Sequence, residues 1–174
     1  MTVTTNPAIT GVQTLNNSPT IVAPNIVGTT TNDAAAAGSV GELLQGTLVE
    51  PGAPVSLTTN TAANITSISL TPGDWDVSGV IGFNGSNTTT VEQLTGGISQ
   101  TSATLPASYN SSARLSFNTS SLPFGAAVGD TTVLALAPLR VSLASTTTLY
   151  LVAKANFAVA SCAAFGRISA RRMR

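Results

Sequence analysis

Histidine is absent from this chain of 174 residues, and cysteine occurs only once, at Cys162. Without histidine there is no ordinary Ser-His-Asp or Cys-His catalytic arrangement. The commonest zinc ligand is missing as well, and one cysteine does not replace it. A single cysteine forms no disulfide within one chain, and its small apolar neighbours in AVASCAAFG predict a buried, inert thiol. We therefore expect a protein without catalytic residues, cofactor or metal.

Charged side chains are also scarce, at 8% of the residues, against about a quarter in an ordinary soluble domain. Polarity comes instead from 46 Ser and Thr residues, which suit strands and turns better than helices. Residues 1–140 hold seven acids and two bases, net −5, and the last 34 residues hold five bases and no acid, net +5. This composition favours a β protein with a basic C-terminal end.

The basic end places four arginines within eight residues, and its alternation predicts two faces. If Gly166, Ile168 and Ala170 face inward, then Arg167 and Arg171 stand together on the opposite face. Such a cluster is also typical of nucleic-acid binding. We expect instead that some of the arginines pair with acids of the chain, within or between subunits, and that nucleic acid is not the partner. The four arginines are Arg167, Arg171, Arg172 and Arg174.

Long hydrophobic runs are lacking. No stretch of about 18 apolar residues is present, so no membrane insertion is expected. The start, MTVTTNPAIT, has neither the positive charge nor the apolar core of a secretory signal. The chain is therefore expected to stay in the cytoplasm in which it is made.

Residues 1–38 form a compositional zone of their own. Pro7, Pro19 and Pro24 interrupt a stretch of Thr, Asn and short apolar pairs, and prolines at that spacing prevent a regular internal strand. We interpret this zone as an extended arm without a core, protease-sensitive in the free protein and ordered once bound.

Strand patterns follow one another over residues 39–174. The stretch SISLTPGDWDVSGVIGFNG, residues 67–85, reads as a β-hairpin whose turn is Thr71-Pro72-Gly73-Asp74, with Gly73 at the position of positive φ. In its second half Trp75, Val77, Gly79, Ile81 and Phe83 share one face, as in a half-buried strand.

Further strands are expected around TTTVEQLTGGISQ, with a bulge at Gly96-Gly97, and around DTTVLALAPLRVSLAS, with an interruption at Pro138. TTTLYLVAKANFAV alternates again, and SCAAFGRISARR forms the last strand. About eight strands with turn residues between them predict an all-β fold, an antiparallel β-sandwich of the jelly-roll type, with the N-terminal arm outside it.

Several of these segments resemble a known family. LTPGDWDVSGVIGFNG, PLRVSLASTTTLYLVA and SCAAFGRISA resemble strands of the tumour-necrosis-factor-like and complement-type jelly rolls. GSVGELLQG and LASTTTLYLVAKANFAVASCAAFGRISARRMR look like segments of fibre, decoration or tail-associated proteins of tailed bacteriophages. This resemblance covers roughly residues 39–174. It implies an eight-stranded jelly roll that forms trimers, and it carries over no catalytic residue.

The function expected from this resemblance is that of a non-enzymatic virion structural protein. It would be a homotrimer on the particle surface, with residues 1–38 bound to other virion proteins. Tyr150, Val152 and Phe165 lie opposite the apolar sets expected in the core, and they are our candidates for the trimer interface. The alternative is a tail-fibre tip that binds a host surface glycan or protein.

Two further sets of residues raise the question of a ligand. Asp74 and Asp76 flank Trp75, an arrangement that a carbohydrate-active enzyme uses as paired acids. The simpler interpretation is that Asp74 completes the turn, Asp76 points to solvent and Trp75 packs in the core. Tyr109 and Asn110 lie in a long loop and are the candidates for ligand contact, because loops at the ends of sandwiches commonly bind.

Overall fold

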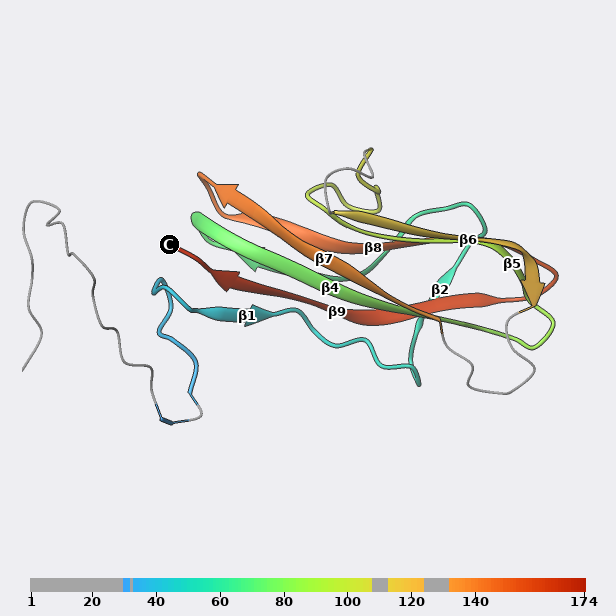
Figure 1. Ribbon diagram of the computed structural model, residues 1–174, viewed down its shortest axis with the longest axis horizontal. Coiled ribbons are helices and arrows are strands. Elements are labelled where there is room, and N and C mark those ends of the chain that lie inside the picture. The colour runs from blue at the N-terminus through green and yellow to red at the C-terminus, as the bar shows by residue number, and fades with distance from the viewer. Residues whose placement is uncertain (1–29, 32, 108–112, 124–131) are drawn as a thin grey trace, which may run out of the picture. The chain divides into compact units, whose positions relative to one another are not determined.

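The computed structural model describes residues 30–31, 33–107, 113–123 and 132–174, without the side chains of residues 119–123. The chain divides into two compact units, Met1–Asp33 and Ala34–Arg174. Most of the expected arm lies outside the described residues, and all the strands belong to the second unit (Figure 1). Within the described part of the chain, no helix is long and apolar enough to cross a membrane.

The second unit is an antiparallel β-sandwich, as predicted, and its described residues form nine strands rather than about eight. They are β1 (Leu43–Gln45), β2 (Val55–Leu57), β3 (Ala63–Leu70), β4 (Gly73–Gly85), β5 (Thr90–Ser99), β6 (Arg114–Pro123), β7 (Thr132–Leu143), β8 (Thr147–Ala158) and β9 (Cys162–Arg172).

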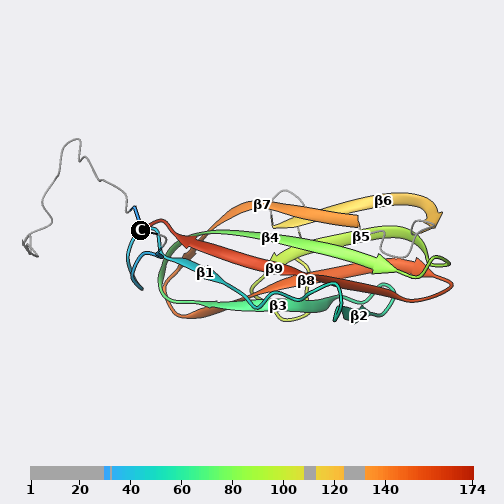
Figure 2. The same cartoon turned by 90° about the horizontal axis from the view of Figure 1, so that it is seen from below.

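Two sheets form the layers of this sandwich. The five-stranded sheet has the order β1-β9-β4-β7, with β2 also paired to β9, and the four-stranded sheet has the order β3-β8-β5-β6. Consecutive strands therefore alternate between sheets along much of the chain, which is the arrangement of a jelly roll. Figure 2 shows the five-stranded sheet face on, with β7, β4, β9 and β1 side by side in that order.

The core lies between the sheets and follows the expected alternation. Trp75, Val77, Ile81 and Phe83 of β4 are fully buried, and burial of each such side chain contributes about 1.5–3 kcal/mol. In β8 and β9 the same face is supplied by Leu149, Leu151, Ala153, Ala155, Cys162, Ala164, Ile168 and Ala170.

The predicted hairpin over residues 67–85 is wrong. β3 pairs with β8, whereas β4 pairs with β7 and β9 in the other sheet. Gly73 does have a positive φ, of 145°, but the two residues Thr71 and Pro72 carry the chain from one sheet to the other. The Nε1 of Trp75 donates to the Thr71 carbonyl at 3.0 Å and holds this crossing. Both strands keep an apolar face because the two faces meet across the core.

Irregularities in pairing occur at one of the two expected places. The shift between β4 and β7 lies between Val77 and Gly79, opposite the segment that contains Pro138. Proline is tolerated there because β7 is an edge strand. The expected bulge at Gly96-Gly97 is wrong, since β5 shifts register between Val91 and Gln93 and pairs regularly across both glycines.

Candidate functional site

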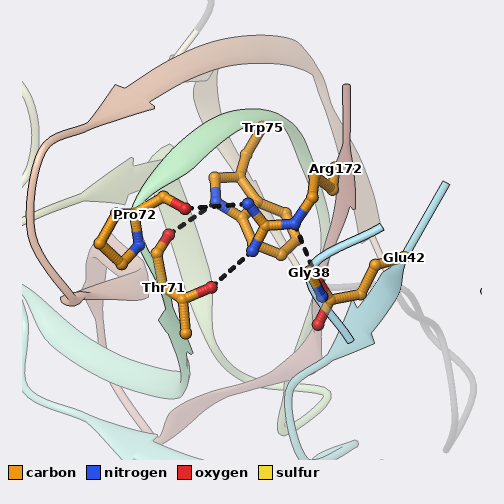
Figure 3. A network of polar contacts seen from close by, with 6 residues as sticks. All are labelled: Gly38, Glu42, Thr71, Pro72, Trp75 and Arg172. Carbon is orange, nitrogen blue, oxygen red and sulfur yellow. Dashed lines mark hydrogen bonds and ion pairs between the residues drawn. The ribbon is translucent and has the colours of Figure 1, made fainter. Parts of the chain in front are cut away.

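Arg172 forms a buried polar clamp where β9 ends. Its Nε donates to Glu42 Oε2 at 2.8 Å, its Nη1 to the Pro72 carbonyl at 2.8 Å, and its Nη2 to Thr71 Oγ1 at 2.5 Å. The guanidinium carbon lies 4.2 Å from the ring centroid of Trp75 (Figure 3). The side chain is only 6% exposed. One arginine thus joins the crossing between the sheets to the segment before β1.

Glu42 holds the other half of this clamp. Its Oε2 also accepts the backbone N–H of Gly38 at 2.9 Å, and the backbones of Glu42 and Arg172 are bonded at 2.9 Å. The hydrogen bond from Arg172, and then that from Gly38, holds the pKa of Glu42 below its ordinary 4.5. Residues 38–42 are therefore fixed to the last strand of the sandwich.

A second ion-pair cluster lies at the same end of the sheet, around Asp74. Arg140 binds its carboxylate through two donors, Nε to Oδ1 at 2.8 Å and Nη2 to Oδ2 at 2.8 Å, and Arg174 Nε lies 3.0 Å from Oδ2. The hydrogen bond from Arg140 is the main cause of a lowered Asp74 pKa. Asp74 is therefore a carboxylate bound by two arginines, while Asp76 is exposed. The exposure of Asp76 and the packing of Trp75 in the core agree with the simpler interpretation.

The expectation that arginines of the basic end pair with acids of the chain is confirmed for Arg172 and Arg174. It is not seen for Arg167 and Arg171, which are exposed on the outer face of the five-stranded sheet and have no ion pair within the described residues. The exposure of Arg167 and Arg171 agrees with the predicted alternation, in which both lie on the face opposite Gly166, Ile168 and Ala170. The burial of Arg172 was signalled by its alternation with Ile168 and Ala170, the inward residues of β9.

The outer face of the five-stranded sheet contains a hollow of about 400 Å³. We call it the apolar hollow and define it by Leu48, Val80, Val133, Ala135 and Phe165, which lie among its lining residues. Leu48, Val80 and Val133 are 45%, 48% and 56% exposed. Phe165 is half-buried because its ring lies over Gly82, where any Cβ would collide with it. This surface is concave and apolar, and strands form most of it.

Charged groups border the apolar hollow without ion pairs of their own. Glu50 and Arg167 are among its lining residues. A neighbouring hollow of about 320 Å³ shares Ser78 and Ser169 with it and is lined by Asp76 and Arg171. Within the described ranges none of these four charged residues forms an ion pair. The two hollows are therefore lined by two acids and two bases.

The outer face of the four-stranded sheet differs sharply, because polar groups there bond to one another. Asn156 donates to Glu92 at 2.5 Å, Gln93 donates to Asn118 at 2.8 Å, and the hydroxyls of Thr95 and Ser116 lie 2.6 Å apart. The apolar Val152 on this face is fully buried. The segment that follows β5 explains this: Pro106 and Leu105 approach Gly97, the register partner of Val152. Asn64 holds the same segment through Ser102 and Ala103.

The residues expected at a trimer interface do not form one surface. Tyr150 and Val152 lie on β8 in the four-stranded sheet, and Phe165 lies on β9 in the five-stranded sheet. Tyr150 is half-buried and Val152 is inaccessible in the chain. Only Phe165 belongs to the apolar hollow. The other candidates, Tyr109 and Asn110, lie outside the described residues.

Cys162 is a buried free thiol, as predicted, and burial raises its pKa to about 11. Among the residues that the structure describes, no group of three or more His, Cys, Asp or Glu is placed to hold a metal ion.

Comparisons with known proteins complete this description. No protein-family model matches the sequence, and no curated protein matches it. Among solved structures, the chain is similar to a protein of T=1 particles derived from infectious bursal virus, with a TM-score of 0.34 and 14% identity. The match covers 86% of this chain and 36% of the viral protein, so the chain spans about a third of that protein.

Proposed function

We propose that this chain is a non-enzymatic structural subunit of a virus particle, a trimeric fibre or decoration protein bound to other virion proteins through residues 1–38. The observation that carries the proposal is the difference between the two outer faces of the sandwich. One face satisfies its own polar groups, and the other presents the apolar hollow. Exposed apolar surface on a rigid scaffold is typical of a protein contact.

The clamp supports the same proposal. Arg172 at the end of β9 binds the carboxylate of Glu42, and the same carboxylate accepts the backbone N–H of Gly38. The chain before β1 is therefore attached to the sandwich at a fixed point, and an anchoring arm would be attached there. The resemblance of residues 39–174 to bacteriophage fibre and decoration proteins adds the kind of assembly.

The test is the composition of purified particles. We expect mass spectrometry of gradient-purified particles from a producing culture to find the full chain in many copies, still bound after a wash in high salt. Absence of the chain from particles would contradict the proposal. Saturable binding of the purified protein to host cells would instead favour the receptor-binding tip.

A further inference from the structure

We infer that the outer face of the five-stranded sheet is the surface on which a second copy of this chain docks, with Val80 and Val133 buried in the contact. The inference rests on the proposed function in one respect, that the chain is an assembly subunit. It goes further by assigning the face and its residues, and it replaces the interface expected from Tyr150 and Val152.

Several exposed hydrophobic side chains lie on this face. Of the nine large hydrophobic residues exposed within the described ranges, Leu43, Leu48, Val80 and Val133 lie here. Val80 lies on the central strand β4 and Val133 on the edge strand β7, and their register partners are outward-facing as well. A hollow formed mostly by paired strands keeps its shape without a ligand, so docking on it costs little conformational entropy.

The charges on the face favour a second copy over a partner of another kind. A nucleic acid or an acidic protein requires an excess of bases, and a basic protein requires an excess of acids. The linings of the two hollows have neither, since Glu50 and Asp76 balance Arg167 and Arg171. A copy that presents the same face supplies an acid for each of these bases, and a base for each acid.

The order of the strands allows copies joined by such a contact to form a closed ring. Leu48 and Glu50 lie on the β1 side of β9, whereas Val133 lies on β7 at the opposite edge of the sheet. Copies that turn this face toward a common axis bring the β1 side of one against the β7 side of the next. Leu48 of one copy then approaches the side of the face that carries Val80 and Val133 in its neighbour.

The test is photo-crosslinking of the full-length chain with benzoylphenylalanine in place of Val133. Copies labelled with nitrogen-15 are mixed with unlabelled copies, so that a crosslink between copies carries both isotopes. We expect mixed-isotope crosslinks to residues 43–51 or 163–171. Crosslinks within one copy only, crosslinks to residues 1–29 or to the four-stranded sheet, or no crosslink at all would overturn the inference.

A pair of matched variants gives an independent readout. Val80→Lys/Val133→Lys places two charges in the contact, and Val40→Lys/Val159→Lys places the same charges on valines that are 69% and 79% exposed elsewhere. We expect the first variant to dissociate at least tenfold more readily than the second by analytical ultracentrifugation, with equal thermal stability of the folded chain. Equal dissociation of the two variants would overturn the inference. Detection of the chain in particles would be unaffected by that result, so the two proposals fail separately.

Discussion

The guanidinium of Arg172 lies over the ring of Trp75, 4.2 Å from its centroid, while its Nε donates to Glu42. The contact joins the last inward residue of β9 to the first large core residue of β4. It therefore ties together the segment before β1, the crossing between the sheets and the end of the chain. A buried charge in such a place is stable only while its partners remain.

Replacement of Arg172 tests this role. Arg172→Met keeps much of the packing on Trp75, but it removes the cation that pairs with Glu42 and loses three hydrogen bonds. We expect the melting temperature to fall by roughly 10 °C. Arg171→Met, the matched control, changes an exposed residue without an ion pair in the described part of the chain, and a shift of about 2 °C or less is expected. Equal shifts in calorimetry would contradict the clamp.

Acid should weaken the clamp in a defined direction. The pKa of Glu42 is lowered in the folded chain, so its contribution is present above the ordinary value of 4.5 and is lost as the pH falls through the folded pKa. We expect Glu42→Gln to be less stable than the native chain near pH 7, with a difference that shrinks below about pH 4.5. The measurement is urea unfolding at a series of pH values. A difference that stayed constant down to the acid transition would show that the pair does not stabilise the fold.

Gly166 is required by the contact between β9 and β4. Its φ is 146°, and a Cβ at this position would collide with the Val80 carbonyl oxygen. We expect Gly166→Ala to cost about 2–3 kcal/mol or more of unfolding free energy. Gly52→Ala is the control, because nothing lies within 4 Å of a Cβ there. Denaturant unfolding of the two variants measures the difference, and similar midpoints would be inconsistent with this packing.

The thiol of Cys162 should be unreactive in the folded protein. It is 2% exposed, and burial raises its pKa to about 11, so little thiolate forms at moderately alkaline pH. We expect no reaction with a disulfide reagent at pH 8 over an hour, and full reaction after unfolding in guanidinium. Rapid reaction of the native chain would mean that β9 opens at its start.

Alternation along single strands was predictable from the sequence, and long-range pairing was not. The inward faces of β4 and β8 follow from spacing alone, because each strand buries one side against the opposite sheet. The crossing at Thr71-Pro72 has the sequence of a hairpin turn, because turn residues do not determine which sheet the next strand joins.

For the candidate site, too, the sequence predicted local alternation and did not predict contacts between distant residues. Arg172 alternates with the core residues of β9, but a charged side chain usually lies on the surface. Its burial is explained by its distant partner Glu42. Val152 has the parity of an outer residue, but the segment after β5 covers it. The apolar hollow combines residues from β4, β7, β9 and the segment after β1, and such a surface exists only once the sheet order is known.

The central claim is that this chain assembles with copies of itself, and the molar mass of the purified full-length protein tests it most directly. Light scattering at micromolar concentration should give about 52 kDa, three times the 17.4 kDa of one chain. The same mass should be found for Val40→Lys/Val159→Lys and a smaller one for Val80→Lys/Val133→Lys. A stable species of 17.4 kDa for the native chain at that concentration would contradict the account.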